Sequence, residues 1–389
     1  MIKIVFNNAI RCGGMCSYCS VASQEHYIGG VNTKDIINSV RKADLDSYNL
    51  IKWDFDALYK TIVNSEYFDG DFSIWGADPL NSFSAFQELY DFLKYLTNKE
   101  NKTLHMHGST NGLSFVIDEW NEWLLKHKEK VGNFQLSHDG LGQWVRTRDF
   151  DPLELPSIKE LVDNNIVRNI NCVLNFWNAS PFQNIDYFRA HDVGFRTIRI
   201  YNAREEKYTT HTLNTLGKLN NDCFNELKLK PLGDLCIRND IKLAQEYGIK
   251  QLAHQADLFF SEYDFIYSNP DKFPQKYVKP LLERVKRNSR RGSFWYMSRP
   301  HCAEYHLGKR NTTPIIDTLG KYCDCHLFDS NMHVTNPTMK KPEYCNGCKY
   351  FDRYECNLCG AHPLPEDKVT CDFMYRFNAL MEKYRNKIK

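Results

Sequence analysis

The sequence lacks any long hydrophobic run. In its 389 residues no apolar stretch approaches the ~20 residues that a membrane-spanning helix needs. The opening segment Met1–Phe6 is too short for the hydrophobic part of a signal peptide. The formal net charge is only +2, so overall electrostatics do not favour a nucleic acid or an acidic surface as the partner. We therefore expect an intracellular, cytoplasmic protein without a membrane partner.

Cysteine is not scarce, but it is unevenly distributed. Hydrophobic residues make up 42% and charged residues 25% of the chain, which is ordinary for a soluble globular protein of about two to three domains. Of the 14 cysteines, three lie within residues 12–19 and eight lie between residues 302 and 371. Intracellular chains rarely use so many cysteines for disulfides. The clustering therefore indicates metal binding.

The first cluster has the spacing CxxxCxxC, formed by Cys12, Cys16 and Cys19 directly after a short apolar segment. Thiolates are the usual protein ligands of iron–sulfur clusters. Three of them can hold three irons of a [4Fe–4S] cluster and leave the fourth iron open for chemistry. The alternatives are three unrelated buried cysteines or a structural zinc site, for which His26 is the nearby candidate for a fourth ligand.

Strand-like and helix-like segments alternate through the first half of the chain. The expected strands are Lys3–Asn8, Asp71–Trp75, Thr103–Gly108, Asn133–Ser137, Val167–Asn175 and Phe195–Tyr201. The expected helices are 54–68, a helix with the aromatic stripe Phe83, Phe86, Tyr90 and Leu93, then Ile117–Lys128, Pro156–Asn164 and Ile185–His191. This alternation predicts a parallel α/β sheet with right-handed connections. Alternation alone does not separate an open sheet from part of a barrel.

The cysteine motif, with Tyr18 before its last thiol, resembles that of the radical S-adenosylmethionine (SAM) enzymes. The resemblance implies a six-stranded parallel partial TIM barrel, (β/α)6. It also implies that the open iron binds the amino and carboxylate groups of SAM and that Tyr18 lies near the adenine. In this family, reductive cleavage of SAM gives a 5′-deoxyadenosyl radical, which abstracts a hydrogen atom from the substrate.

A second motif follows the second expected strand. Gly76-Ala77-Asp78-Pro79 resembles the family's Gly-Gly-Glu-Pro segment, whose backbone binds the amino group of SAM. It departs from that pattern at Ala77 and Asp78. A backbone carbonyl is kept when glycine becomes alanine, so we expect the role to persist. The other interpretation is an ordinary turn after a strand.

Further SAM-site residues are expected after the later strands. Asn111 lies in a Thr-Asn-Gly turn that resembles one common in the family, and Ser137 begins a Ser-x-Asp-Gly segment that arginines follow. A guanidinium can grip a carboxylate through two hydrogen bonds, so Ser137 and Arg146 or Arg148 are candidate partners of the SAM carboxylate or ribose. Asn175, after the fifth strand, is a further candidate. Bare turns and surface arginines are the alternative.

Three histidines, His105, His107 and His138, also lie in or next to the expected strands. Such side chains can line an active site. A histidine at a strand end is more often a satisfied polar residue, and we interpret these three in that way.

The cysteines near the C-terminus resemble the SPASM domain that follows many radical SAM cores. The shared features are a first cysteine, a Gly320-x4-Cys325 hairpin, a four-cysteine run and a last cysteine. The run departs from the family because its inner spacings are seven and two instead of five and three. The resemblance assigns a first auxiliary [4Fe–4S] cluster to Cys302, Cys323, Cys325 and Cys359, and a second to Cys345, Cys348, Cys356 and Cys371. A zinc knuckle, or a twitch-type domain with one cluster, is the alternative.

The resemblance implies three regions: a radical SAM core at 1–205, a helical bridge at 206–300 and a SPASM-like domain at 301–389. Relatives of this subgroup, such as the anaerobic sulfatase-maturing enzymes and peptide maturases, modify peptide or protein side chains. We therefore expect an oxidoreductase that acts on a peptide or protein and receives electrons from a donor such as flavodoxin or ferredoxin. Asp317 and Asp324 are candidates for a base. Because the chain opens on a strand, a leader-binding module is expected to be a separate protein.

Two other functions stay open. Six basic residues against one acid between Lys279 and Arg291 allow a radical SAM enzyme that modifies a nucleotide or a nucleic-acid base. A zinc-stabilised binding protein without enzymatic activity is the other alternative. Metal content separates this last function from the first two.

Overall fold

A parallel β-sheet forms the centre of the computed structural model. The structure describes residues 1–6, 33–76, 78–143, 150–174, 180–191, 195–200, 260–273 and 314–323, with single positions or short pieces from 282 to 384. The strands are β1 (Ile2–Val5), β2 (Asp71–Trp75), β3 (His105–Thr110), β4 (Phe134–Ser137), β5 (Val167–Leu174), β6 (Phe195–Ile200) and β7 (Ile315–Asp317). Their order is β6-β5-β4-β3-β2-β1-β7, and each neighbouring pair is parallel. The expected parallel α/β fold is confirmed.

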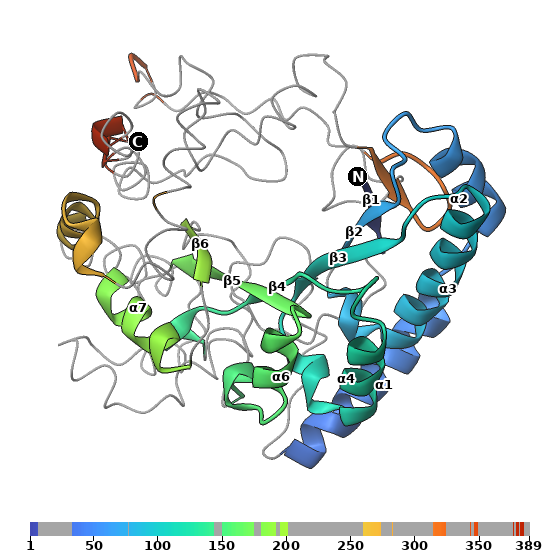
Figure 1. Ribbon diagram of the computed structural model, residues 1–389, viewed down its shortest axis with the longest axis horizontal. Helices are drawn as coiled ribbons and strands as arrows, with labels where there is room; N and C mark the ends of the chain where they lie inside the picture. The colour runs from blue at the N-terminus through green and yellow to red at the C-terminus, as the bar shows by residue number, and fades with distance from the viewer. Residues whose placement is uncertain are drawn as a thin grey trace.

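Helices connect successive strands. They are α1 (Thr33–Leu50), α2 (Phe55–Val63), α3 (Phe83–Lys99), α4 (Asp118–Lys126), α6 (Ile158–Asp163) and α7 (Pro181–Ala190). Figure 1 shows α1 to α4 together on one flank of the sheet. No helix among the described residues combines the length and apolar character needed to cross a membrane.

Helix α2 illustrates how local sequence sets an element. The side chain of Asp54 accepts a hydrogen bond from the backbone N–H of Ala57 at 2.9 Å, which satisfies a donor at the start of the helix. Leu58 and Ile62, one turn apart, are fully buried. The helix predicted from Asp54 is therefore confirmed at its start, but it ends at Val63 because residues 65–70 form turns instead.

The aromatic stripe of α3 belongs to the core, as the sequence predicted. Phe83, Phe86, Tyr90 and Leu93 are each at most 2% exposed. Phe86 packs edge-on to Trp123 of α4, and Tyr90 contacts the same indole ring. Burial of large aromatic side chains contributes much of a domain's hydrophobic stabilisation. The stripe therefore attaches α3 and α4 to one face of the sheet.

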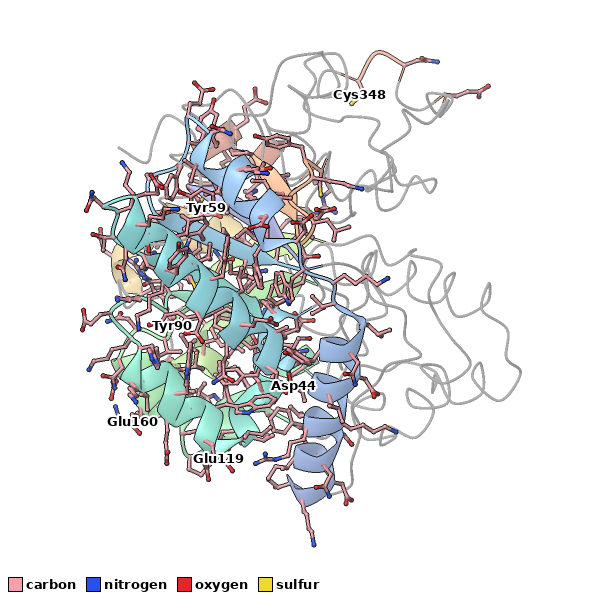
Figure 2. The ribbon with its side chains drawn as sticks, turned by 90° about the vertical axis from the view of Figure 1, so that its right-hand side faces the viewer. Asp44, Tyr59, Tyr90, Glu119, Glu160 and Cys348 are labelled. Carbon is pink, nitrogen blue, oxygen red and sulfur yellow. The ribbon has the colours of Figure 1, made fainter. Side chains whose placement is uncertain are left out.

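Helix α1 was not predicted from the sequence, although its buried residues Ile36, Val40 and Ala43 recur at helical spacing. Its buried Asp44 accepts hydrogen bonds from both the backbone N and the Oγ of Ser84, at 2.9 and 2.6 Å, at the start of α3. Figure 2 shows Asp44 where α1 passes α3. The apolar face of α1 also packs against Leu113, Val116 and Ile117, so an apolar face and a polar contact together fix this helix.

The seventh strand corrects the prediction of a six-stranded sheet. Residues Ile315–Asp317 pair in parallel with β1, in the register Ile4↔Ile316. The chain then turns at residues 318–320, and Tyr322 forms an antiparallel bridge with Ile316. The hairpin turn was predicted, but no pattern in the sequence indicated that its first strand would extend the core sheet. Residues from the expected C-terminal region therefore complete the edge beside β1.

Part of the expected bridging region also packs on the core. Residues 260–268 are helical, and Glu262 accepts hydrogen bonds from Ser180 Oγ and Phe182 N at the start of α7, at 2.7 and 2.9 Å. Tyr263 and Ile266 of this helix belong to the main hydrophobic cluster. Most of the expected helical bridge 206–300 lies outside the described residues, as does almost all of the basic run 279–291.

Candidate functional site

The carboxyl ends of strands β1 to β4 lie along one edge of the sheet. The segment that carries the first three cysteines begins at this edge, after β1. The backbone N of Phe6, just after β1, donates to the carbonyl oxygen of Trp75, the last residue of β2, at 2.8 Å. Cys12 is six residues further on, and six residues reach at most about 20 Å. Cys12, Cys16, Tyr18 and Cys19 themselves lie outside the described residues. The segment that carries them therefore starts at the edge of the sheet where active sites of such folds gather.

The turn after β2 has a conformation that needs its glycine. Gly76 has φ +146°, a region that residues with a Cβ rarely adopt. Ala77 lies outside the described residues. Asp78 then caps a short 3-10 helix, η2 (Pro79–Asn81), through a hydrogen bond of 3.1 Å from Leu80 N to its carboxylate. Gly76 thus directly follows Trp75, the hydrogen-bond partner of Phe6, and Asp78 caps the short helix that comes next.

The Asp78 side chain does more than cap this turn. It is 1% exposed, and its Oδ2 accepts hydrogen bonds from Asn111 N at 2.6 Å and Thr110 Oγ1 at 3.2 Å, at the end of β3. Burial raises the pKa of Asp78 to about 7, although these hydrogen bonds oppose the rise. The sequence indicated only a backbone role for this segment. The carboxyl group in fact joins the ends of β2 and β3.

Asn111 continues the same network. It is 4% exposed, and its Oδ1 accepts from Leu113 N at 2.9 Å, at the start of the 3-10 helix η3 (Leu113–Val116). Gly112 between them has φ +80°, the left-handed region that favours glycine. The Thr-Asn-Gly turn is therefore held from both sides.

Replacing Gly112 with alanine is expected to destabilise the fold by about 2–5 kcal/mol, by adding steric overlap to backbone strain. A Cβ at this position would lie 2.7 Å from Pro152 Cβ and 2.8 Å from Leu136 Cδ1. Gly347→Ala is a matched control, because Gly347 has φ +73° but none of the described residues has an atom within 4 Å of an added Cβ. Denaturant unfolding of both variants measures the difference. Equal losses would contradict the packing around Gly112.

Ser137 ends β4 at the same edge of the sheet. It is 9% exposed, and its Oγ lies 3.3 Å from the Oγ of Ser109 on β3. Arg146, Arg148 and Asn175, the other expected SAM-site residues, lie outside the described residues. The structure therefore brings Gly76, Asp78, Asn111 and Ser137 to one edge. Their contacts with SAM stay a prediction.

A buried hydrogen-bond network next to Ser137 was not predicted from the sequence. His138 is fully buried; its Nδ1 accepts from Gly140 N at 2.9 Å, and its Nε2 lies 2.8 Å from Asp151 Oδ1. The hydroxyl of Tyr187 on α7 donates to the other oxygen of Asp151. Burial raises the pKa of Asp151, but the hydrogen bonds from His138, Tyr187 and Leu153 N outweigh burial and leave the pKa below its ordinary value. His138 is thus a satisfied polar residue, as predicted, that supports the turn after β4.

The candidate base Asp317 lies at the end of β7. It is 1% exposed, and its Oδ1 accepts from Leu319 N and Lys321 N at 3.0 and 2.9 Å. These contacts hold its own turn. Asp324, the other candidate, lies outside the described residues. A role for either as a base stays a prediction.

Two of the expected auxiliary-cluster cysteines can be placed. Cys323 is buried beside Val5 and Ile315, next to the edge strand β7, and Cys348 is half-buried. Those outside the described residues are Cys302, Cys325, Cys345, Cys356, Cys359 and Cys371. The ligand assignments within this set stay predictions.

Neither a protein-family model nor a curated protein matches the chain significantly. Solved structures do. One, native anSMEcpe with bound AdoMet (SAM), is 16% identical and aligns over 99% of this chain and 100% of that chain with a TM-score of 0.51. Another, with bound AdoMet and the Cp18Cys peptide, is 17% identical over 100% and 99% of the two chains, with a TM-score of 0.50. The resemblance inferred from the sequence is thus confirmed at the level of the fold: this chain has the fold of anSME, an anaerobic sulfatase-maturing enzyme of the radical SAM type.

Proposed function

We propose that this chain is a radical SAM enzyme. The observation that carries the proposal is the hydrogen bond between Phe6 N and Trp75 O, which starts the CxxxCxxC segment beside the Gly76–Pro79 turn. The turns after β3 and β4 lie along the same edge of the sheet. The segment that carries the thiols and the segments that form the polar turns thus begin at the ends of neighbouring strands, as a single shared site requires.

The potential ligands at this edge of the sheet suit a [4Fe–4S] cluster and SAM. Cys12, Cys16 and Cys19 would hold a [4Fe–4S] cluster, and three thiolates would leave one iron for SAM. When bound, the two cofactors supply reductive cleavage of SAM and hydrogen-atom abstraction from the substrate. The expected contribution of Gly76–Pro79 is backbone acceptors for the ammonium of SAM.

The hydrogen bonds of Asp78 support this assignment. The carboxyl group of Asp78 fixes both the β2 turn and the β3 turn, through Leu80 N and Asn111 N. These contacts therefore hold Asp78 and the η2 helix that follows it in place before a ligand arrives. Preorganised polar groups need little reorganisation during the reaction. Ser137, Arg146 or Arg148, and Asn175 are proposed to bind the remaining polar groups of SAM, with Tyr18 near the adenine.

For the substrate, we propose a peptide or protein side chain. Support comes from the anSMEcpe structure that holds the Cp18Cys peptide together with AdoMet. The C-terminal cysteines are proposed to hold two auxiliary [4Fe–4S] clusters in a SPASM-like domain, and Asp317 or Asp324 to accept a proton. An external flavodoxin or ferredoxin would supply electrons.

Anaerobic reconstitution of the full chain with iron and sulfide tests the proposal. We expect about 12 irons per chain if all three clusters form, against about 4 with the first cluster alone. With SAM and dithionite the loaded protein should form 5′-deoxyadenosine. A protein that retains neither iron nor sulfide, and leaves SAM intact, would contradict the proposal.

A further inference from the structure

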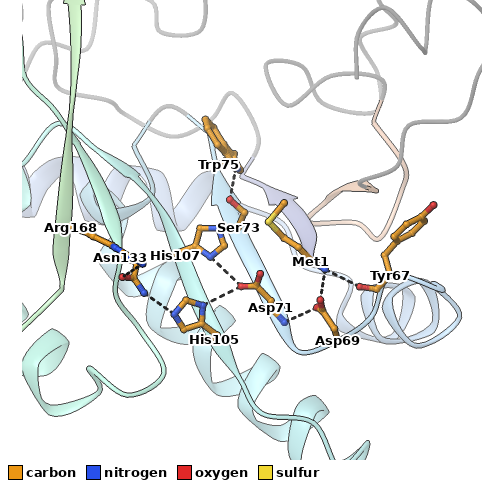
Figure 3. Close-up of polar contacts among 10 residues, drawn as sticks. All are labelled: Met1, Tyr67, Asp69, Asp71, Ser73, Trp75, His105, His107, Asn133 and Arg168. Atoms are coloured by element: carbon orange, nitrogen blue, oxygen red, sulfur yellow. Dashed lines mark hydrogen bonds and ion pairs between the residues drawn. The ribbon is translucent and has the colours of Figure 1, made fainter. Parts of the chain in front are cut away.

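Three potential metal ligands lie together at the amino ends of β2 and β3, away from the turns that form the candidate SAM site. Asp71 is the first residue of β2, and His105 is the first residue of β3. These two residues are direct partners in the sheet register, and His107 pairs with Ser73 one step along. Because side chains alternate along a strand, Asp71, His105 and His107 share one face. Figure 3 shows the three side chains converging.

This face is the one opposite the helix-covered core. The intervening residues Phe72 and Met106 are fully buried in the main hydrophobic cluster, together with Phe86 of α3. The side chains of Asp71, His105 and His107 are instead 36%, 38% and 24% exposed. The three side chains are thus partly exposed, although the Nδ1 atom of His107 is itself buried.

The distances suit a tetrahedral ion. Asp71 Oδ1 lies 3.1 Å from His105 Nδ1 and 3.2 Å from His107 Nδ1. The three ligand atoms lie within 4.8 Å of one another. With metal–ligand bonds of about 2.0–2.2 Å, neighbouring ligands of a tetrahedral zinc are about 3.4 Å apart. Binding therefore needs only small side-chain movements.

The hydrogen bonding of the ring nitrogens of His105 and His107 is incomplete. His105 Nδ1 has hydrogen-bond geometry toward Asp71, and Asn133 Nδ2 lies 3.1 Å from the other nitrogen of that ring. His107 Nδ1 is close to the same carboxylate, but its angles do not meet hydrogen-bond geometry. Among the described residues no other atom bonds to it. A buried ring nitrogen directed at a carboxylate in this way is an available metal ligand.

We propose that Asp71, His105 and His107 bind a zinc ion, with water as the fourth ligand. Two imidazoles and one carboxylate are a donor set that suits Zn²⁺ and has no thiolate, so it differs from the cysteine sites. Ligation through Nδ1 places the proton of His105 on Nε2, so the Asn133 amide, whose Nδ2 faces that nitrogen and whose Oδ1 accepts from Arg168, has to turn over to accept it. The ion joins the amino ends of β2 and β3.

Zinc binding can be measured on the full chain after anaerobic reconstitution with iron and sulfide. Wild type and the variants Asp71→Asn, His105→Ala and His107→Ala are dialysed against buffered zinc, and metals are counted by mass spectrometry. Each variant should lose about one zinc per chain, with an affinity more than about 100-fold weaker and an unchanged iron content. His127→Ala is the matched control, because His127 is also half-buried but its Nδ1 contacts the carbonyl oxygen of Trp123. It should bind zinc like wild type.

Two further measurements keep the test decisive if a variant folds poorly. Zinc should raise the melting temperature of wild type, since a ligand that binds only the folded state stabilises it. X-ray absorption should show that this zinc has nitrogen and oxygen ligands at about 2.0–2.1 Å and no sulfur. Equal zinc content in wild type and all three variants, or sulfur-only ligation, would overturn the proposal. Neither outcome depends on SAM cleavage, so the proposed function is tested separately.

Discussion

Replacing Cys16 with alanine is expected to abolish 5′-deoxyadenosine formation from SAM in the presence of dithionite. Two thiolates, from Cys12 and Cys19, would remain in the segment that leaves the sheet beside the Gly76–Pro79 turn. Thiolates are the ligands that hold such clusters, and the motif supplies three of them. When one thiolate is lost, the ligand set on which the proposed site depends is no longer complete. Product analysis by chromatography measures the effect directly.

A second cysteine supplies the control. Cys172 lies fully buried in β5, within the main hydrophobic cluster. Cys172→Ala removes a sulfur from the core but no ligand from the motif. We expect this variant to keep SAM cleavage at a rate comparable to wild type. Cleavage by Cys16→Ala at the wild-type rate would show that the first motif is not the site of chemistry.

Replacing Asp78 with asparagine should change how stability depends on pH. Burial raises the pKa of Asp78 from 3.8 to about 7, so the folded state holds a proton that the unfolded chain has already released above pH 4. Wild type is therefore most stabilised by this group at low pH and loses that contribution as pH rises toward 7. Asparagine is neutral throughout. Between pH 5 and 7, the free energy of unfolding of wild type should fall by about 2–3 kcal/mol relative to Asp78→Asn.

Denaturant unfolding of both proteins at several pH values measures this difference. Asp54→Asn is a suitable control, because Asp54 also caps a helix but has an exposed side chain. Its difference from wild type should vary much less over the same pH range. A constant difference between wild type and Asp78→Asn would show that Asp78 is ionised in the folded protein. Its hydrogen bonds from Asn111 N and Leu80 N would then outweigh the cost of burial.

Period-two and helical patterns in the sequence predicted the six strands and most of the helices between them. The predicted bounds of β2, Asp71–Trp75, match the observed ones, because polar and apolar residues alternate from Asp71 to Ile74 and a turn follows at Gly76. β3 was placed two residues too early at each end. Its residues His105 and His107 are polar, and pairing with Asp71 and Ser73 decides its boundaries. Long-range pairing thus overrides local pattern at this strand.

The candidate SAM site was only partly predictable. Motif resemblance identified Gly76–Pro79, Asn111 and Ser137, which the fold places along one edge. The carboxyl group of Asp78 was not expected to tie two strands together, because its partners are more than thirty residues away. The support of His138 by Asp151 and Tyr187 was likewise hidden, since three separate segments meet there.

The sequence by itself determined the alternating α/β fold and the grouping of the thiols, because periodicity and spacing are local properties of the chain. Only the tertiary structure decided that β7 joins β1, that Asp78 is buried between two turns, and that Asp71 faces two histidines. Each of these depends on strand order and register. Strand order and register are set by how distant segments pack together, and a local sequence pattern does not specify that packing.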